Sequence, residues 1–591
     1  MHTFSKVLVA NRGEIAVRIF RTLRELGIES VAIYSDADRG ALHARVADEA
    51  FWIGRGPAGE SYLCGNVIIE TALRADVSAI HPGNGFLDEI ASFARAEEEA
   101  GITWIGPPAA AIELMGSKTA ARTAMKNAGV PIIPGATEPI RTATAVIELG
   151  EEIGYPLIIK AAAGGGGKGM EIVTSPAGAL PAFEAAQRQG LKYFADDTVY
   201  VERYLEGPRH VEAQILADCH GTVLFLGERD CTIQRRHQKL IEETPSPAVD
   251  DALRARIGEI AVNAARAAGY RSAGTIEGLL TRDGDYFFME MNTRIQVEHT
   301  VTEIVTGLDL IREQILIAQG EPLSIAQEDV VLRGHAIECR INAEDVSKGF
   351  LPAPGTITEY EEPSGPGVRV DSGVRAGDEI SGLYDPMIAK LIVHDTSRET
   401  ARKRMLRALA EFKISGPPTL LGFHAALLTE PCFIDGGTCQ GRVESQGLAQ
   451  RADEMTELFT HRTTSLQRRS DGTATREQIF AVEVDGRSFD VRIHTTEPPW
   501  ASLGRRRRER MVGATGSGSG AVVSPMQGTI LSVAVADGDH IETGGVICVI
   551  EAMKMENEIT AQHAGTVRSL AVTAGQSVAN GQLVCLLAGA E

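Results

Sequence analysis

Several features are absent from the 591-residue sequence, and each absence excludes a class of protein. No run of about 18 apolar residues occurs, so no helical membrane span is expected. The first apolar run, Val7–Ala10, is too short for the core of a signal peptide. The eight cysteines form no Cys-x-x-Cys pair and no zinc-ligand spacing. We therefore expect a cytoplasmic chain whose cysteines are reduced.

Positive charge is also scarce. The sequence has 58 lysines and arginines against 79 acidic residues, which gives a net charge of −21. This imbalance argues against general binding to nucleic acids or anionic membranes, and a negatively charged ligand would need a local basic pocket. The hydrophobic content of 43% and the charged content of 23% are typical of soluble globular proteins. The length by itself predicts about four domains.

Two common nucleotide-binding motifs are missing. A strand at Lys6–Ala10, a turn at Asn11–Glu14, a helix to Leu26 and a strand at Ser30–Tyr34 predict a β-α-β start on a parallel sheet. This start lacks Gly-x-Gly-x-x-Gly, so no dinucleotide site is expected. A later glycine run ends in Lys168, which is not followed by Ser or Thr, so the run is not a Walker A loop.

The glycine run is nevertheless a candidate phosphate loop. Gly164–Gly167 are four consecutive glycines, whose backbone N–H groups can approach phosphate oxygens without interference from Cβ atoms. Strands are predicted on both sides, at Ile158–Lys160 and Met170–Val173. A flexible polar linker is the alternative, and the flanking strands argue against it.

A hairpin predicted over Thr275–Gln296 places two carboxylates opposite each other. Asp283-Gly284 is a strong two-residue turn signal. With those residues as the turn, Glu277 is directly opposite Glu290, with Cβ atoms about 4.5–5.5 Å apart. Facing carboxylates repel unless a cation lies between them, and Mg²⁺ bound to phosphate groups is the natural bridge.

A period of two continues after this hairpin. Alternate residues of a strand share one face. The residues on this face are Glu290, Asn292, Arg294, Gln296 and Glu298. One strand would therefore present metal ligands, an anion receptor and a potential base in a row, whereas the alternative is an exposed polar face.

An internal repeat lies near the C-terminus. Residues 528–552 match the residues from 565 onward at a constant offset of 37, with identical pairs such as Thr529/Thr566 and Cys548/Cys585. Both copies alternate small apolar and polar residues between glycine turns, which predicts a duplicated β domain with a pseudo-twofold axis. The hairpin that joins the halves carries Lys554, and a rigid tip suits a lysine that is modified and then reaches elsewhere. An ordinary surface lysine is the alternative.

These motifs resemble known families. Ala552-Met553-Lys554-Met555 resembles the biotinyl domain of biotin carboxyl carrier proteins, whose biotin is amide-linked to the lysine. Lipoyl domains usually flank their lysine with an acidic residue and alanine, so the two methionines favour biotin. The runs Asn11–Ala16, His81–Leu87 and Glu290–His299 are similar to biotin carboxylases. Over about residues 5–430 and 521–590, the chain resembles the alpha subunit of a biotin-dependent acyl-CoA carboxylase.

The resemblance implies an α/β and α+β multidomain fold. The expected order is a Rossmann-like N-terminal domain (1–117), an ATP-grasp domain (118–330, with a lid at about 132–205), a biotin carboxylase C-terminal domain (331–446), a small β-rich partner-docking segment (447–498), a flexible linker (499–520) and a β-sandwich or flattened-barrel biotinyl domain (521–591). A linker of this length spans about 25–30 Å on average, so the tethered biotin could visit two separate active sites.

The resemblance also implies a reaction. Bicarbonate, MgATP (or MnATP) and the biotin on Lys554 give carboxybiotin, ADP and phosphate through carboxyphosphate. The positions that match catalytic residues are Glu298, Lys239, Arg294 and Arg340. Bicarbonate is assigned to Lys239, Arg294, Gln296 and Val297, and the metal to Glu277, Glu290 and Asn292. The ATP site is assigned to Lys118, Lys160, Gly165, Gly166, Gly167, Lys168, Glu202, Leu205, His210, Gln234 and His237.

The cation-rich run Arg229–Lys239 is interpreted in the same way. It stands out in an acidic protein, and a solvated basic face is the simple explanation. The match to the biotin carboxylase motif favours a pocket for bicarbonate and phosphates instead. We expect the side chains of this run to line the active site.

The sequence departs from the biotin carboxylase pattern at several positions. Asn84 stands where the family usually has Tyr, Ile90 where it has Asn, Ser117 where it has Asp, Thr300 where it has Pro, and Pro386 where it has Ser. The first four of these departures keep a second hypothesis open, in which the chain is a carrier or scaffold subunit with an impaired ATP-grasp site.

The expected partners follow from the resemblance. No carboxyltransferase domain follows the carrier, so a separate beta subunit is expected to use the carboxybiotin, and a biotin protein ligase to attach the biotin. The acceptor is expected to be acetyl-CoA or propionyl-CoA, and methylcrotonyl-CoA is the alternative. We expect a hetero-oligomer that binds neither nucleic acid nor membrane.

Overall fold

The computed structural model describes residues 3–136, 138–161, 170–194, 197–236, 238–467, 475–484, 487–496, 521–552 and 555–588. The chain divides into two compact units, residues 1–455 and 456–591. Within the described ranges, no helix combines the length and the apolar composition that a membrane crossing requires.

The first unit begins with a five-stranded parallel sheet in the order β3-β2-β1-β4-β5. Its strands are β1 (Lys6–Val9), β2 (Glu29–Ser35), β3 (Glu49–Gly54), β4 (Ala79–His81) and β5 (Thr103–Trp104). The helices around it are α1 (Gly13–Glu25), α2 (Leu42–Val46), α3 (Gly65–Arg74), α4 (Ala91–Glu99) and α5 (Ala109–Gly116). Because both faces of β1 are covered, it is apolar from Val7 to Val9, as the β-α-β prediction requires.

An eight-stranded sheet forms the centre of the first unit, in the order β13-β12-β9-β10-β11-β14-β21-β19. Its strands are β9 (Arg209–Ala217), β10 (Val223–Arg235), β11 (Gln238–Thr244), β12 (Ser272–Leu280), β13 (Tyr286–Asn292), β14 (His335–Asn342), β19 (Val368–Ser372) and β21 (Met387–Asp395). The sheet is continuous across the domain boundary predicted at residue 330, because β11 pairs with β14.

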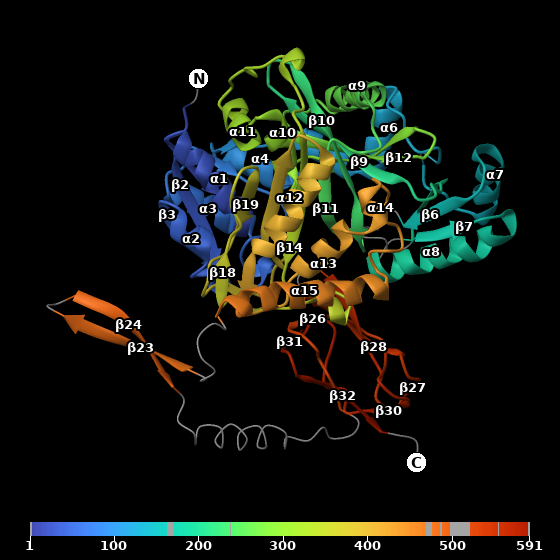
Figure 1. Ribbon diagram of the computed structural model, residues 1–591. Coiled ribbons are helices and arrows are strands. Elements are labelled where there is room, and N and C mark those ends of the chain that lie inside the picture. Colours follow the sequence, from blue (N-terminus) through green and yellow to red (C-terminus); the bar gives the residue numbers. More distant parts are fainter. Residues whose placement is uncertain are drawn as a thin grey trace. The chain divides into compact units, whose positions relative to one another are not determined.

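Helices cover this sheet. The covering helices are α6 (Lys118–Asn127), α9 (Asp251–Ala267), α10 (His299–Thr306), α11 (Leu310–Ala318), α12 (Arg398–Glu411), α13 (Leu421–Leu428) and α14 (Pro431–Ile434). The Asp250 side chain accepts a hydrogen bond from the Leu253 N–H and so caps α9, which packs on β9 and β10 (Figure 1). Small two-stranded sheets complete the unit: β15 (Glu344–Asp345) with β16 (Leu351–Pro352), β17 (Gly355–Thr356) with β20 (Glu379–Ile380), and β18 (Glu359–Glu361) with β22 (Lys413–Ser415).

A lid stands at one side of the central sheet (Figure 1). It consists of α7 (Ala143–Ile153), β6 (Leu157–Ala161), β7 (Met170–Val173), α8 (Ala179–Phe194) and β8 (Val199–Arg203). β6 pairs with both β7 and β8, so the strands predicted around the glycine run are confirmed. The run itself, residues 162–169, lies outside the described residues.

Two cysteines near the end of the first unit are joined. Cys432 and Cys439 form a disulfide with a Cα–Cα distance of 5.3 Å, so the expectation of fully reduced cysteines is wrong at this pair. The Gly437 N–H donates to the Cys432 carbonyl oxygen at 2.6 Å, and this turn returns the chain to the first cysteine. Among the described residues, the other six cysteines are free.

The weak periodicity of residues 446–475 predicts at most one helix, over about Ala452–His461, and helix α15 (Gln446–Gln467) is longer at both ends. Leu448 and Ala452 are buried, and Arg451 reaches back to Glu430 and to the Thr429 hydroxyl. The polar sequence does not indicate the full length of this helix, because part of its anchoring comes from ion pairs rather than from an apolar stripe.

A hairpin follows in the second unit. The turn signal Asp485-Gly486 between the runs Ile479–Val484 and Ser488–Ile493 predicts it, and β23 (Thr475–Val484) pairs with β24 (Arg487–Thr496). Residues 485 and 486 and the predicted linker at 499–520 lie outside the described residues. The hairpin forms a two-stranded sheet of its own, and a lone hairpin is only marginally stable in water.

The C-terminal part is a sandwich of two four-stranded sheets, β25-β32-β30-β27 and β29-β28-β26-β31. Its strands are β25 (Ala521–Val523), β26 (Gly528–Val533), β27 (His540–Ile541), β28 (Val546–Ala552), β29 (Met555–Thr560), β30 (Gly565–Arg568), β31 (Ser577–Val578) and β32 (Leu583–Ala588). A shift of 37 residues carries β26, β27 and β28 onto β30, β31 and β32, and it exchanges the sheets. The predicted pseudo-twofold architecture is therefore confirmed. No strand pairing closes the two sheets into a barrel among residues 521–552 and 555–588.

Candidate active site

A cavity of about 980 Å³ lies between the lid, the central sheet and the loop after β13. Most of the predicted site residues line it. These are Lys118, Lys160, Glu202, Leu205, His210, Gln234, Lys239, Glu277, Glu290, Asn292, Arg294, Gln296, Val297, Glu298 and Arg340. The remaining predicted residues, Gly165, Gly166, Gly167, Lys168, His237 and Lys554, lie outside the described residues.

A row of charged residues crosses four adjacent strands of the central sheet. Glu290 on β13 is opposite Glu277 on β12, Glu277 is opposite Glu212 on β9, and Glu212 is opposite Arg229 on β10. Directly opposed residues have Cβ atoms about 4.5–5.5 Å apart, so three carboxylates lie side by side. The prediction for Glu277 and Glu290 is confirmed, and Glu212 was missed. The alternation His210, Glu212, Gln214 along one strand was the available signal.

The turn that led to this register differs from the prediction. The connection is a loop over Thr281–Asp285, in which the Thr281 N–H donates to the Asp285 carbonyl oxygen at 2.9 Å. This loop pairs Leu280 with Tyr286, and a bulge between Glu277 and Gly278 then shifts the register by one residue. Glu277 lies opposite Glu290 because of the bulge, and the prediction of a two-residue turn at Asp283-Gly284 is wrong.

Lys239, on β11, binds three carboxylates at once. Its Nζ lies 2.5 Å from Glu212 Oε2, 2.9 Å from Glu277 Oε1 and 2.6 Å from Glu298 Oε1. Burial disfavours the ammonium, yet the three carboxylates raise the pKa of Lys239 well above its usual value. A single fixed positive charge therefore holds together side chains from three strands and a loop.

Glu298 is the residue immediately before α10, and it is not on a strand. β13 ends at Asn292, so the prediction that the strand continues to Glu298 is wrong. Glu298 Oε1 accepts from Lys239 and Oε2 accepts from Arg340 Nη2 at 2.8 Å. Burial opposes ionisation, but Lys239 and Arg340 together hold the pKa of Glu298 well below its usual range. Glu298 is therefore a buried carboxylate with both oxygens held by cations.

Arg340, on β14, is fixed between two carboxylates. Its Nε donates to Glu242 Oε1 at 2.6 Å and its Nη2 to Glu298 Oε2 at 2.8 Å. The planar fork of guanidinium binds such partners in a defined direction. Asn342, Asp385 and Met387 line the cavity near this residue. Arg340 thus presents a directed positive charge to the cavity.

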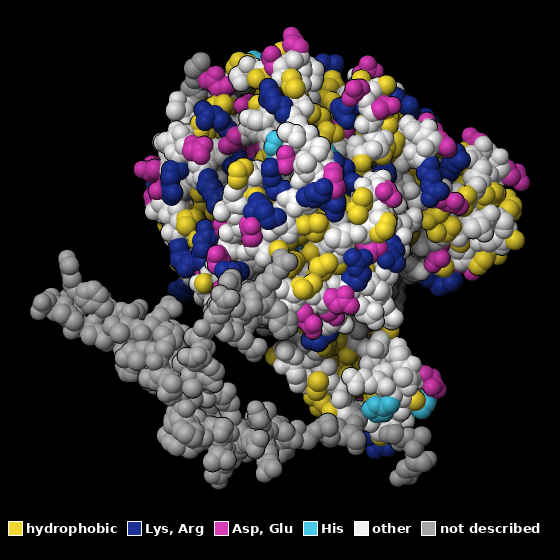
Figure 2. Space-filling view, in the orientation of Figure 1, with side chains coloured by type: hydrophobic (Ala, Val, Ile, Leu, Met, Phe, Trp, Pro, Cys, Tyr) yellow, Lys and Arg dark blue, Asp and Glu magenta, His cyan; other side chains and the backbone are white. Residues whose placement is uncertain are grey.

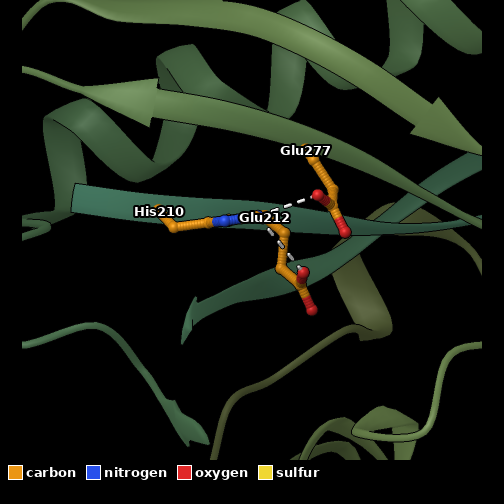
Figure 3. Close-up of side chains that lie close together, drawn as sticks. All are labelled: His210, Glu212 and Glu277. Atoms are coloured by element: carbon orange, nitrogen blue, oxygen red, sulfur yellow. Dashed lines mark ion pairs between the residues drawn. The ribbon is translucent and has the colours of Figure 1, made fainter. Parts of the chain in front are cut away.

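Glu277 and Glu290 suit a divalent cation. Burial and the neighbouring Glu277 raise the pKa of Glu290. Burial also favours the neutral form of Glu277, but Lys239 and His210 outweigh it, so the pKa of Glu277 lies below its usual value. His210 Nε2 lies 2.9 Å from Glu277 Oε2 and 3.9 Å from Glu212 Oε2 (Figure 3). Among the described residues, no ion pair reaches Glu290, and the Asn292 Nδ2 is buried without a hydrogen bond. A divalent cation between the two glutamates would relieve this repulsion.

Arg294 is held by the N-terminal domain. Its Nε lies 3.2 Å from Glu89 Oε2 and 3.3 Å from Asp88 Oδ2. Glu89 also accepts a hydrogen bond from the Thr293 N–H at 3.0 Å, which takes the place of a backbone hydrogen bond to a neighbouring strand. Burial is outweighed by these acids, so the pKa of Arg294 lies well above its usual value. Glu89 was not predicted as a site residue.

The lid side of the cavity carries its own charges. Glu202 on β8 pairs with Lys160 on β6, and its Oε2 lies 3.1 Å from Arg122 Nη1. Burial lowers the pKa of Lys118 at the start of α6. His210 Nδ1 and Gln234 Nε2 are 2.8 Å apart. Cations and hydrogen-bonding groups thus line this side of the cavity.

Arg229 is a structural residue rather than a pocket residue. It is fully buried, and Arg235 and Arg236 do not line the cavity either. The expectation that the run Arg229–Lys239 lines the site is therefore confirmed for Lys239 alone among its described cations. The Arg229 guanidinium donates to Glu212 at 2.5 Å, Gln214 at 2.6 Å, Gln296 at 2.7 Å, Thr302 at 3.0 Å and Thr275 at 3.2 Å. It therefore orients Glu212 and Gln296 from beneath the cavity.

We expect Arg229→Met to destabilise the protein by about 3–5 kcal/mol, because it leaves Glu212 buried with one cation fewer. Chemical denaturation followed by fluorescence measures the loss. Arg256→Met is the matched control, since the Arg256 side chain is 51% exposed and 3.9 Å from Asp285. We expect a change within about 0.5 kcal/mol for this control. Equal losses in the two variants would contradict the role assigned to Arg229.

Comparisons with known proteins agree with this architecture. The family profile of the biotin carboxylase N-terminal domain matches residues 3–112, the ATP-binding domain of the carbamoyl-phosphate synthase L chain matches 117–326, and the biotin carboxylase C-terminal domain matches 338–444. The profile of biotin-requiring enzymes matches residues 520–587. A biotin carboxylase from Nostoc is 53% identical over 441 residues, which cover 75% of this chain and 99% of that protein.

The chain belongs to the biotin carboxylase family. It combines a biotin carboxylase with a biotin carboxyl carrier domain, and it is a ligase-type enzyme of a biotin-dependent carboxylase. The alpha3 subunit of a biotin-dependent acyl-coenzyme A carboxylase from Mycobacterium leprae is 43% identical over 569 residues, 94% of each chain. The alpha subunit of a mitochondrial methylcrotonoyl-CoA carboxylase from rice is 52% identical over 73% of this chain and 59% of that one.

Solved structures share the fold of this biotin carboxylase. The biotin carboxylase domain of a 2-oxoglutarate carboxylase from Hydrogenobacter thermophilus, in complex with MgADP, ADP and bicarbonate, has a TM-score of 0.70 and 44% identity, covering 78% of this chain and 99% of that one. A biotin carboxylase complex from Campylobacter jejuni has a TM-score of 0.71 and 45% identity, covering 74% and 98%. The cofactors of the enzyme are covalent biotin, ATP and Mg²⁺.

Proposed function

We propose that this chain carboxylates the biotin on Lys554 and supplies it to a separate carboxyltransferase subunit that acts on acetyl-CoA or propionyl-CoA. The observation that carries the proposal is the match to an acyl-CoA carboxylase alpha subunit over 94% of both chains, which includes the carboxylase and the carrier. Matches to methylcrotonoyl-CoA and pyruvate carboxylase subunits each cover 73% of this chain.

Bicarbonate binding is assigned to Lys239, Arg294 and the Gln296–Val297 backbone. Bicarbonate is a poor electrophile, so its oxygen must first attack the terminal phosphorus of ATP, with ADP leaving, to give carboxyphosphate. Glu298 takes the bicarbonate proton. Lys239 and Arg340 hold Glu298 ionised at distances of 2.6 and 2.8 Å. As Lys239 turns to the bound anion, the pKa of Glu298 rises and it becomes a better base.

The phosphates are assigned to the lid side of the cavity. Lys118 and Lys160 line it, and with His237 they would balance the negative charge that develops during phosphoryl transfer. Glu277, Glu290 and Asn292 would hold the divalent ion, which when bound neutralises phosphate charge. Lys160 must leave Glu202 to reach a phosphate, and its flexible four-carbon stem allows this.

Biotin is assigned to the Arg340 end of the cavity. The ureido N–H is a very weak acid, so negative charge must be stabilised on the ureido oxygen when the carboxyl group is transferred. Arg340 stays protonated at any working pH and is directed by Glu242 and Glu298. It would bind the ureido oxygen through its fork.

The second unit is assigned to delivery and docking. The hairpin β23–β24 needs a covering surface for stability, which suits a site for the carboxyltransferase subunit. Ala552 pairs with Met555, so the strands β28 and β29 bracket Lys554 in sequence.

Figure 2 shows acidic and basic side chains interspersed over the visible face of the first unit, without a basic patch of the kind that binds nucleic acid.

An acyl-CoA panel tests the proposal. The full chain, biotinylated and purified with its carboxyltransferase partner, is assayed for ATP-dependent transfer of radiolabelled bicarbonate to acetyl-, propionyl- and methylcrotonyl-CoA. We expect labelled product from acetyl-CoA or propionyl-CoA. Label in methylcrotonyl-CoA alone would overturn the acceptor assignment. Failure of free biotin to stimulate bicarbonate-dependent ATP hydrolysis would overturn the carboxylase assignment itself.

A further inference from the structure

Two buried glutamates lie opposite each other behind Arg340. Glu242 on β11 pairs directly with Glu338 on β14, and neither side chain is exposed to solvent. Opposed residues in an antiparallel pair have Cβ atoms about 4.5–5.5 Å apart. Two carboxylates at this separation in a buried site cannot both be ionised without a cation between them.

Each of these carboxyl groups has one bonded and one unbonded oxygen. Glu242 Oε1 accepts from Arg340 Nε at 2.6 Å, and Glu338 Oε2 accepts from the Thr300 hydroxyl. Glu242 Oε2 and Glu338 Oε1 are buried and have no hydrogen-bond partner among the described residues. Unpartnered buried oxygens are rare in proteins. One proton between the two groups would satisfy both oxygens at once.

The nearby cations are already engaged. Arg340 also binds Glu298, and Lys390, which is opposite Arg340 in the sheet, lies 3.1 Å from Glu14 Oε2 and donates to the Val297 carbonyl oxygen at 2.9 Å. Among the described residues, no ion pair reaches Glu338 within 4.0 Å. The pair therefore lacks the positive charge that two ionised carboxylates would need.

Other titratable and charged groups surround the pair without supplying that charge. Lys239 and Glu298 lie toward the cavity, Lys390 is on β21, and the Cys339 thiol lies between Glu338 and Arg340 in sequence. His424 of α13 contacts the Arg340 carbonyl oxygen, and Glu243 is paired with His335 and with Arg398 of α12. Burial, partly offset by Arg340, raises the pKa of Glu242 to about 7. Burial raises the pKa of Glu338 well above its usual range. Lys390 opposes this effect, and Glu242 adds to it.

We propose that Glu242 and Glu338 share one proton and, as a pair of positioning residues, set the direction of the Arg340 guanidinium. The proposal rests on the proposed role of Arg340 at biotin. With one proton, the pair carries a single negative charge, and Arg340 lies balanced between this charge and Glu298. Loss of the proton adds a second negative charge on one side of Arg340. The guanidinium is then drawn toward the pair and away from the biotin site.

Thr300 tunes the pair in this chain. The family usually has proline at this position, which could not donate a hydrogen bond to Glu338. A donor to a carboxylate favours its ionised form, so the Thr300 hydroxyl lowers the pKa of Glu338 relative to a chain without it. Removal of the hydroxyl should therefore make the shared proton harder to lose.

The sign of the pH effect follows from the raised pKa values. An unfolded glutamate titrates near pH ~4.3, so the folded pair binds more protons than the unfolded chain above that pH. Its contribution to stability is complete below that value and is lost as the pH rises through the folded pKa values. Biotin-stimulated turnover should decline in the same direction, when the pair loses its last proton.

The test compares the pH dependence of free-biotin-stimulated ATP hydrolysis in full-length variants. In Glu338→Gln the amide cannot ionise, and we expect the alkaline decline of the wild type to move up by at least ~1 pH unit or to disappear. In Thr300→Val we expect an upward shift of about 1 unit, the effect of one hydrogen bond to a charged group. Glu97→Gln is the matched control, because Glu97 on α4 is a fully buried carboxyl without a described hydrogen bond. Its profile should not move.

Infrared difference spectra between neutral and alkaline pH provide a readout that does not require activity. The wild type should lose carboxylic-acid C=O absorbance as the pH rises, and Glu338→Gln should lack that change while Glu97→Gln keeps it. An unmoved alkaline decline in both Glu338→Gln and Thr300→Val, or identical spectra for wild type and Glu338→Gln, would overturn the proposal. If Glu338→Gln does not fold, the Thr300→Val shift decides. Absence of biotin stimulation in the wild type would instead contradict the proposed function and leave the infrared result interpretable.

Discussion

Replacement of Lys554 by arginine is expected to abolish biotin attachment and all turnover that depends on the carrier. Biotinylation needs a nucleophilic amine, and the arginine guanidinium stays protonated. Lys554 is the only lysine in residues 521–591, so no neighbour in the carrier can replace it. Intact-mass spectrometry after co-expression with a biotin protein ligase measures the adduct. We expect one biotin on the wild type and none on Lys554→Arg.

The same variant separates the two halves of the enzyme. Lys554→Arg should still hydrolyse ATP in response to bicarbonate and free biotin, because the cavity is lined by residues between 89 and 440 and the first unit is intact. Lys348→Arg is the matched control, since the Lys348 side chain is 69% exposed and its charge is kept. A biotin adduct on Lys554→Arg, or equal loss in Lys348→Arg, would contradict the assignment of the attachment site.

Substitution of Arg340 by alanine should abolish transfer to biotin and leave ATP binding largely intact. Removal of one donor to a developing oxyanion lowers kcat by about 10²–10³, and a charged, two-pronged donor belongs at the upper end. The variant also leaves Glu242 and Glu298 without their shared cation. Free-biotin carboxylation and ATP affinity by calorimetry measure the two effects separately.

Two further variants sharpen this experiment. Arg340→Lys keeps the charge but loses the fork, so we expect intermediate activity. Arg375→Ala is the matched control, because the Arg375 side chain is 45% exposed and its partner is Glu362 at 3.2 Å. Unchanged carboxylation in Arg340→Ala, with wild-type ATP affinity, would disprove the assignment. A large loss of ATP affinity would instead indicate that Arg340 maintains the structure of the whole cavity.

Local sequence patterns predicted many features of the site correctly. The facing of Glu277 and Glu290 followed from alternation and a turn signal, although a longer loop and a bulge produce the register. The strand predicted beyond Asn292 does not form, because the neighbouring β12 pairs no further than Thr275. Glu89, about 200 residues earlier, takes the Thr293 N–H instead. Local alternation does not reveal such a distant partner.

The sequence by itself determined the parts whose chemistry is local: the Lys554 hairpin within its repeat, the glycine run between two strands, and the facing carboxylates on one hairpin. Only the tertiary structure decided which charges meet. Lys239 meets Glu212, Glu277 and Glu298, and Arg340 meets Glu242, because β9, β11, β12 and β14 belong to one sheet. The physical reason is that strand pairing between residues distant in sequence, here 27 to 98 positions apart, is selected by the burial and packing of whole faces. Neither propensity nor periodicity within one strand specifies it.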